Sequence, residues 1–386
     1  MRGPAVSRRG FAAGAALLAL LPAAAGAAPK PRSGARAEQW RAAMENGFAL
    51  NDGTGLYREY APAAATDAKY ATEWPFSQAH IAYLDLAMTD AAAARRHGAA
   101  LARVRAAEEL YWSDTSASGQ GGYLSRVVPP LGPGDDLYYD DNEWVGLAQV
   151  QHYRFFRTPE SLAHARAVFE LIRSGWSEDP RLPFPGGVRW TQKADNGDRN
   201  TVSNMPAAQL GIRLYQITGE RAYLDDALRY YRWTNAVLQR PDGLYHDHVK
   251  VDGTIEKTVW TYNQGVPIAV NALLWRVTGE DQYLKEAKRI ATASRDRFPL
   301  AQLDRQPPPF NAIYFKNLLL LDGVSHTREH VPAMRDYADH MWRNRRDTAT
   351  GLCRPRDGRA ELIDTAAMVQ IEAVLGWAPE NWTALY

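Results

Sequence analysis

The chain repeats a short corner motif at a spacing of about 60 residues, and this repeat limits the folds open to it. Residues Ile217–Glu220 read ITGE, and residues Val277–Glu280 read VTGE. A looser copy, RTPE, spans Arg157–Glu160 one period earlier. Each copy separates two apolar helical patterns and offers a threonine suited to helix capping and a glutamate for the first turn. The repeat therefore predicts a series of helical hairpins with tight corners.

The hairpins predict an all-α fold. Reading outward from the corners gives about twelve helices, near residues 37–50, 77–89, 91–112, 141–157, 160–174, 203–218, 220–238, 262–278, 280–297, 310–322, 326–345 and 364–376. The connections alternate between two or three residues and roughly twelve to thirty, and one long connection suggests a small β-hairpin, 245–250 with 254–257. Six hairpins that close on themselves form an (α/α)6 barrel with short turns on one rim and long loops on the other. Long loops are usually functional, so we expect the chemistry where the even-numbered helices begin.

The first 28 residues have the pattern of an export signal. They combine a basic start, an apolar run over Phe11–Leu21 and small residues over Ala25–Ala28. The segment Ser7–Phe11 reads SRRGF and resembles the twin-arginine signal, and the apolar run is too short for a mature membrane helix. We therefore expect a signal peptide over residues 1–28 and a single domain over residues 36–386. The protein would be periplasmic or secreted, without membrane contact after signal removal.

Composition excludes several classes of protein. Lys plus Arg (45) nearly equals Asp plus Glu (44), so no overall field would draw the chain to nucleic acid. Cys353 is the only cysteine, which excludes an intrachain disulfide and a cysteine zinc cluster. Twelve Trp, 19 Tyr and 10 Phe provide apolar faces suited to stacking on sugar rings. We expect a monomer that binds a carbohydrate.

The segment YYDDNEWVG, residues 138–146, places two aspartates side by side at the predicted start of a helix. The amide dipole favours negative charge there, and an aspartate in that position is also a common structural device. Glycoside hydrolysis needs two carboxyl groups, about 5 Å apart in retaining enzymes. Mutual repulsion raises one pKa, so one acid stays protonated while its neighbour is ionised. Asp140 and Asp141 are therefore the candidate catalytic pair.

Aromatic and amide side chains gather near the predicted starts of the even-numbered helices. Such side chains stack on sugar rings and hydrogen-bond sugar hydroxyls. The candidate substrate-binding residues are Trp74, Gln78, Tyr139, Trp144, Trp190, Arg199, Asn204, Trp260, Tyr262, Asn263, Gln264 and Asn311.

The stretch YYDDNEWVGLA resembles the signature of glycoside hydrolase family 76, the endo-α-1,6-mannanases. The similarity runs from about residue 36 to the C-terminus and includes GGVRW at 186–190 and TYNQG at 261–265. The resemblance implies an (α/α)6 fold, retaining cleavage inside α-1,6-linked mannan, and no required metal or other cofactor. It also matches Asp140 to the nucleophile and Asp141 to the acid/base. The family's Phe-Lys-Gly segment is Phe315–Asn317 here, a departure at the glycine.

Other interpretations stay open at this point. The same fold could transfer the mannosyl group to a sugar acceptor, or bind mannan without cleaving it. An uronide hydrolase or sugar epimerase would need a basic cleft or a central pair of histidines, which the helix starts do not supply. Two metal-binding patterns are incomplete. His80, His246 and His248 could suggest a metal, but the pair His246-x-His248 has no evident third ligand nearby. The loop with Asp195 and Asp198 lacks the later glutamate of a calcium-binding loop. We predict no metal site.

Overall fold

The corner motifs end helices as the sequence predicts. The computed structural model describes residues 32–355 and 358–386, so the signal peptide expected at residues 1–28 lies outside the described residues. At two corners, Gly219 and Gly279 both have φ of +75°, a conformation that glycine adopts without steric cost. Their amides donate to the carbonyls of Tyr215 and Trp275, which closes the last turn of each helix. The chain can then reverse at once into the next helix.

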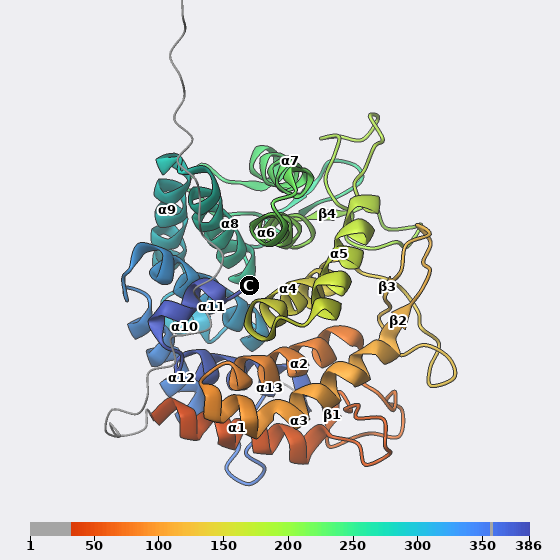
Figure 1. Cartoon of the computed structure of the whole chain (residues 1–386), viewed down its shortest axis with the longest axis vertical. Coiled ribbons are helices and arrows are strands. Elements are labelled where there is room, and N and C mark those ends of the chain that lie inside the picture. The colour runs from red at the N-terminus through yellow and green to blue at the C-terminus, as the bar shows by residue number, and fades with distance from the viewer. Residues whose placement is uncertain (1–31, 356–357) are drawn as a thin grey trace, which may run out of the picture. The chain divides into compact units, whose positions relative to one another are not determined.

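The hairpins close into an (α/α)6 barrel, as Figure 1 shows. The inner helices, each contacting the next around the ring, are α2 (Glu73–Ala87), α4 (Tyr139–Phe156), α6 (Thr201–Thr218), α8 (Tyr262–Thr278), α11 (Pro308–Ser325) and α13 (Leu362–Val374). The outer helices are α1 (Arg32–Phe48), α3 (Ala91–Glu108), α5 (Pro159–Ser174), α7 (Arg221–Leu238), α9 (Asp281–Arg297) and α12 (Val331–Asn344). Residues 32–386 form one compact unit.

The inner and outer helices differ in how many of their residues are buried. In α2 every residue after Glu73 except Trp74 is buried, because this helix has neighbours on all sides. In α9 only Ala287, Ile290, Ala291 and Ser294 are buried, so one stripe of this helix faces the core. The inner helices consequently bring polar side chains into the protein interior, and those side chains need partners there.

The long connections carry short strands and turns. Strands β1 (Tyr60–Ala61) and β7 (Ala360–Glu361) pair, as do β2 (Trp112–Ser113) and β3 (Gly122–Tyr123). The predicted hairpin is confirmed: β5 (His248–Val249) pairs antiparallel with β6 (Ile255–Glu256). Strand β4 (Arg199–Asn200), directly before α6, pairs with the other edge of β5. This three-stranded sheet covers the starts of α6 and α8.

The predicted helix boundaries hold to within a few residues, with two exceptions. The first helix begins at Arg32 instead of 37, and α12 begins at Val331 instead of 326. Before α12, the carboxylate of Asp322 accepts hydrogen bonds from the amides of Glu329 and His330, which holds residues 326–330 in a non-helical turn. A short helix α10 (Leu300–Leu303) and two 3-10 turns, η1 (Glu109–Tyr111) and η2 (Pro379–Ala384), complete the described elements.

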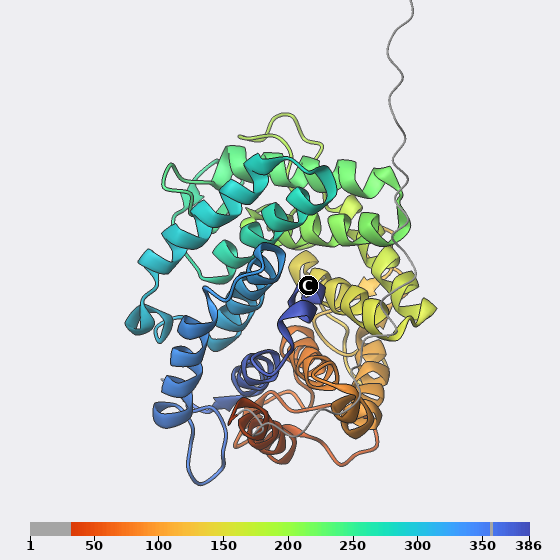
Figure 2. The same cartoon turned by 60° about the vertical axis from the view of Figure 1, so that its left-hand side comes forward.

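Residues 379–386 enter the barrel at the short-turn end, where Arg154 in the last turn of α4 donates to the carbonyl of Thr383. Figure 2 shows the C-terminus within the ring of helices. The guanidinium of Arg213 donates to the carbonyl of Leu385, and the amide of Tyr386 donates to Gln151 at 3.2 Å. The Tyr386 ring lies 6.2 Å from Trp144 and 4.0 Å from the Lys316 ammonium. This segment therefore fills the part of the barrel interior next to the short-turn end. Within residues 32–355 and 358–386, no helix is both long and apolar enough to cross a membrane.

Candidate functional site

Asp140 and Asp141 lie in the first turn of α4, on the long-loop rim of the barrel. Asp140 is buried, with 9% of its surface exposed, and Asp141 is partly exposed. Among the described residues, no lysine, arginine or histidine forms an ion pair with either carboxyl group. The two acids therefore remain next to each other without a counter-charge, which is costly unless at least one is protonated.

Both carboxyl groups are weaker acids than an ordinary aspartate. Burial raises the pKa of Asp140 to about 7, while its own amide, the Trp190 indole and the Asp141 amide oppose this increase. The pKa of Asp141 is raised well above its usual value, first by burial and then by the charge of Asp140. Both carboxyl groups therefore keep their protons to higher pH than an ordinary aspartate, and a charge on Asp140 disfavours a charge on Asp141. Burial is the larger cause, whereas the sequence argument relied on repulsion alone.

Trp190 reaches Asp140 from the long loop before β4. The amide of Tyr139 donates to the carbonyl of Trp190 at 2.9 Å, and Tyr138 pairs with Thr191, so this loop is fixed to the start of α4. The Trp190 indole then donates to Oδ2 of Asp140 at 3.3 Å. Its ring centroid lies 5.1 Å from that of Tyr138. The structure thus brings one predicted tryptophan directly to the acid pair.

Glu73 adds a third carboxyl group that the sequence argument missed. It begins α2, the ring neighbour of α4, and is fully buried. Burial raises its pKa well above the usual value, and the charges of Asp141, Glu108 and Asp140 raise it further. Glu143, one turn after Asp140, is also buried with a raised pKa. The only sequence signal for Glu73 was its place at the start of an even-numbered helix.

Three aromatic rings gather on the same rim around Phe310, a residue that was not among those selected from the sequence. Tyr262 stacks on Phe310 with centroids 3.9 Å apart and planes at 6°. Trp260 and Trp74 lie with centroids 5.4 and 6.0 Å from Phe310. Trp74, Trp260 and Phe310 are partly exposed. These rings come from the starts of α2, α8 and α11, and they provide apolar faces on which a sugar could stack.

Several predicted amides have a structural role instead. Oδ1 of Asn204 accepts from the Val188 amide at 2.8 Å, and its Nδ2 donates to the Val188 carbonyl at 3.1 Å. In the same way, Oε1 of Gln264 accepts from the Tyr245 amide, and its Nε2 donates to the Tyr245 carbonyl. Asn142 on α4 does so with Tyr123. Each amide fixes a long loop to the start of an inner helix, so Asn204 and Gln264 have no free groups for sugar.

Other predicted residues also use their polar groups inside the protein. Arg199 is fully buried and donates to the carbonyls of Pro183, Phe184 and Gly186. We expected its side chain at the substrate cleft, but it holds a loop inside the protein. Oδ1 of Asn311 accepts a hydrogen bond from the Thr261 hydroxyl, and its Nδ2 donates to the Leu303 carbonyl.

Three further predicted residues lie within the core. Trp144 is 1% exposed and lies in the barrel interior against Tyr386. Gln78 accepts from Gln370, and Tyr139 packs close to Gly175. These three, with Asn204, Gln264, Arg199 and Asn311, take no part in the proposal below.

Asn263 remains at the rim. Its Nδ2 donates to Oδ1 of Asp247 at 2.9 Å, and Asp247 in turn contributes to the raised pKa values of Asp140 and Tyr262. Across the described ranges, no cluster of three or more His, Cys, Asp or Glu side chains could hold a metal ion. His246 and His248 are separated by their contacts: His246 faces the Lys257 carbonyl and His248 faces Asp247.

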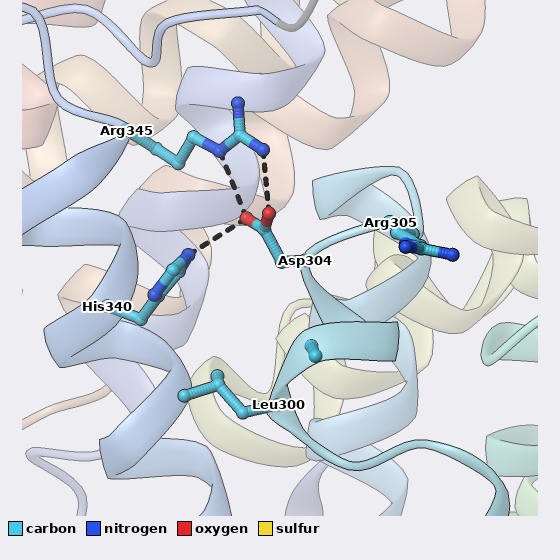
Figure 3. A pocket seen from close by; sticks show the side chains of 6 residues that line it. Leu300, Asp304, Arg305, His340 and Arg345 are labelled. Carbon is cyan, nitrogen blue, oxygen red and sulfur yellow. Dashed lines mark hydrogen bonds and ion pairs between the residues drawn. The ribbon is translucent and has the colours of Figure 1, made fainter.

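An open pocket of about 720 Å³ lies between α10 and α12 (Figure 3), and the acid pair is not part of its lining. There Asp304 accepts two hydrogen bonds from Arg345 and one from His340. Arg345 and His340 lower the pKa of Asp304 to about 2 against the effect of burial. This carboxylate is fully paired, so it ties α12 to the segment before α11 and offers no reactive group.

The rim site has the parts that cleavage of a glycosidic bond requires. One carboxyl group has a pKa raised to about 7, the pKa of the adjacent one is raised by burial and by the charge of the first, and aromatic rings lie nearby. A nucleophile and a proton donor side by side suit a double displacement.

Comparison with known proteins identifies the family. The model of glycosyl hydrolase family 76 matches residues 113–367. A mannan endo-1,6-alpha-mannosidase of Candida glabrata is 31% identical over 273 residues, which cover 64% of this chain and 57% of the relative. One from Saccharomyces cerevisiae is 32% identical over 171 residues, 40% of this chain and 37% of the relative. This chain therefore spans less than two thirds of the length of either yeast relative.

Solved structures share the fold. A family 76 mannosidase of Bacteroides thetaiotaomicron superposes with a TM-score of 0.79 and 22% identity, covering 90% of this chain and 98% of that chain. An α-1,6-mannanase of Salegentibacter sp. superposes with a TM-score of 0.71 and 20% identity, covering 89% and 99%. That structure is an inactive variant with two consecutive aspartates replaced by asparagine, in complex with α-1,6-mannotriose. From the match over residues 113–367, this chain belongs to glycosyl hydrolase family 76.

Proposed function

We propose that this chain hydrolyses α-1,6-mannosidic linkages in mannan with retention of anomeric configuration. The observation that carries the proposal is the acid pair itself: two adjacent carboxyl groups, Asp140 buried and Asp141 partly exposed, without a counter-charge in the described structure and both with a raised pKa. Family membership and the names of the yeast relatives support the choice of substrate. The mannotriose complex of the Salegentibacter protein supports it further.

In the first step, a carboxylate oxygen of Asp140 attacks the anomeric carbon of a mannose unit. The bond from that carbon to the leaving oxygen breaks, and Asp141 gives its proton to this oxygen. In the second step, water attacks the same carbon, Asp141 takes a proton from the water, and the bond to Asp140 breaks. Asp141 must therefore be protonated and Asp140 ionised when substrate binds, and the charge of Asp140 favours this state because it raises the pKa of Asp141.

The partly exposed rings of Trp74, Trp260 and Phe310 would stack on neighbouring mannose units, and the Trp190 indole would hold Asp140 in position for attack. Residues 1–28 would direct export by the twin-arginine route, leaving a periplasmic or secreted monomer.

Product analysis tests the proposal. Linear α-1,6-mannan is incubated with the protein, and proton NMR follows the first reducing ends released. A retaining enzyme releases the α-anomer first, whereas release of the β-anomer would contradict double displacement. Longer products on addition of mannobiose as acceptor would indicate transglycosylation instead of hydrolysis. Mannan that binds but stays uncut after long incubation would indicate a non-catalytic binding protein.

A further inference from the structure

Phe184 has a backbone conformation that a large side chain rarely adopts. Its φ is +55°, in the left-handed region, and the residue is 44% exposed. Among the described residues, the other non-glycine positions with positive φ are Asp135, Arg157 and His326. Arg157 and His326 end helices α4 and α11, and aspartate tolerates this conformation. Phe184 has neither reason, so the contacts around it must hold it there.

Arg199, which has no part in the cleavage site, holds this conformation. Its guanidinium donates to the carbonyls of Pro183, Phe184 and Gly186 at 3.0, 2.6 and 3.0 Å. The indole of Trp233 donates to the same carbonyl of Phe184 at 3.2 Å. Burial lowers the pKa of Arg199, because a buried cation without a counter-charge is costly. A buried guanidinium and a strained backbone therefore combine to present one exposed ring.

The Phe184 ring lies outside the inner ring of helices. Trp233, which contacts it through the carbonyl, belongs to α7, an outer helix (Figure 1). A Cβ added to Gly253 would lie 4.0 Å from the Phe184 ring and 2.8 Å from Pro183, so both side chains border the turn between β5 and β6. Pro183 is also exposed. Pro183, Phe184 and this turn together form an apolar surface, the Phe184 platform.

The loop that carries the platform continues into the cleavage site. Trp190, six residues after Phe184, donates to Asp140 at 3.3 Å. Six residues span at most about 22 Å, so a mannan chain several units long that occupies the acid pair could reach the platform. The loop is also fixed, because the Trp190 amide donates to the Asp198 carbonyl at 2.8 Å, directly before Arg199.

The size of the platform favours a sugar over a protein partner. A stable protein interface uses about 20–30 residues on each side. One exposed aromatic face is enough for the C–H face of a single sugar ring. Arg181, three residues before Phe184, pairs with Asp179 at 2.8 Å, so this neighbouring charge is already neutralised. The platform therefore suits a neutral polysaccharide.

We propose that Phe184 is a second binding position for α-1,6-mannan, outside the cleavage site, where a mannose ring of a bound polymer stacks, and that Arg199 is its positioning residue. The identity of the polymer rests on the proposed function. A second contact raises the local concentration of polymer at the acid pair, so it lowers KM for long chains and leaves short substrates unaffected.

Substrates of two lengths test the proposal. Linear α-1,6-mannan can reach both positions, whereas α-1,6-mannobiosyl fluoride occupies only the acid pair. Phe184→Gly removes the ring and also the strain, because glycine adopts positive φ without steric cost. This variant should raise KM for mannan about threefold to tenfold, the range for one aromatic contact, and leave kcat unchanged. Its kcat/KM for the fluoride should equal that of wild type.

Three comparisons separate recognition from a structural effect. Phe184→Tyr keeps the aromatic face and should retain the wild-type KM for mannan. Arg199→Lys keeps the charge but cannot donate to three carbonyls at once, so it should raise KM for mannan and leave kcat/KM for the fluoride unchanged. Phe155→Ala is the matched control, because Phe155 is 37% exposed at the short-turn end of α4, and it should change neither substrate.

Binding without cleavage distinguishes this inference from the proposed function. In the Asp140→Asn background, calorimetric titration with linear mannan should give a Kd about threefold to tenfold higher when Phe184→Gly is added. The same loss of binding, together with a wild-type protein that never hydrolyses mannan, would support the second position and overturn the proposed function.

Equal losses on mannan and on the fluoride, or no loss on either, would overturn the role of Phe184 and leave the glycosidase proposal intact. Self-association of the wild-type protein that Phe184→Gly abolishes, with mannan binding unchanged, would mean that the ring contacts a second copy of the chain and would also overturn it.

Discussion

Asp85 and Asp140 are both buried carboxyl groups on neighbouring inner helices, but only Asp85 has a cation as partner. Lys316 lies 2.6 Å from Asp85, and Gln151 donates to Asp85 at 2.8 Å. Within the described residues, the one side chain that hydrogen-bonds the Asp140 carboxyl group is the Trp190 indole at 3.3 Å, beside the amides of Asp140 and Asp141. Both are removed from water, and burial raises the pKa of both, but Lys316 offsets part of this cost at Asp85, whereas no cation does so at Asp140. A carboxyl group that is buried without a cation as partner remains available for a reaction.

The comparison predicts opposite effects for the same substitution at the two positions. Asp140→Asn should lower kcat/KM on α-1,6-mannan by at least about 1000-fold, because the nucleophile is lost. The free energy of unfolding at pH 7 should stay equal or rise, since an amide replaces a buried carboxyl group that has no cation. Reducing-sugar assays and denaturant unfolding measure the two effects. Wild-type turnover by this variant would exclude Asp140 as nucleophile.

Asp85→Asn is the matched substitution. It should lower the free energy of unfolding by about 3–5 kcal/mol, because it leaves the Lys316 ammonium buried without its counter-charge. The double variant Asp85→Asn with Lys316→Met should recover part of this loss. The folded fraction at low temperature should retain most of its activity. If Asp85→Asn abolished turnover without lowering stability, the division between structural and reactive carboxyl groups would be wrong.

The same contrast explains what the sequence could predict. The barrel and the position of Asp140 and Asp141 at its long-loop rim follow from local periodicity and from corner motifs, which depend on residues close in the chain. The hydrogen-bond partner of each polar side chain does not follow from such local patterns. Asn204 and Gln264 looked free for sugar, but each is used by a backbone segment of a preceding loop.

A signal for that role was present in the sequence. An amide recurs in the first turn of α4, α6 and α8, and each donates to the carbonyl four residues earlier. In contrast, the stacking of Phe310 on Tyr262 joins residues 48 positions apart, and no local pattern specifies it. The same holds for the hydrogen bond from Trp190 to Asp140, 50 positions away.

Glu73 sharpens the comparison, because it is buried near Asp141 without an ion pair in the described structure. Its pKa lies well above the ordinary 4.5, so the folded state favours the protonated form. Its contribution to stability is therefore lost as pH rises above 4.5. Glu73→Gln should raise the free energy of unfolding at pH 7, by at most about 3 kcal/mol, and change nothing at pH 4. Turnover should stay within about tenfold, since both side chains are neutral.

Glu38→Gln provides the control with the opposite sign. The hydrogen bond from His97 and those from Arg41 and Arg96 lower the pKa of Glu38 to about 2. This variant should lose stability above pH 4.5, and the loss should disappear as pH falls toward 2. Unfolding curves at several pH values measure both variants. A Glu73→Gln protein that is less stable than wild type at pH 7 would mean that Glu73 is ionised in the fold.

Trp190→Phe should produce the smallest effect and tests what limits the reactivity of Asp140. The indole hydrogen bond favours ionised Asp140, so its removal should raise the pKa of Asp140 above the present value of about 7. Since attack requires ionised Asp140, the acidic limb of the kcat/KM profile should move to higher pH by less than about one unit. Mannobiosyl fluoride is the suitable substrate because it needs no proton donor. Trp260→Phe should leave this limb in place, because the Trp260 ring lies against Phe310 instead of Asp140. A shift to lower pH, or an equal shift in both variants, would show that the indole does not control this carboxyl group.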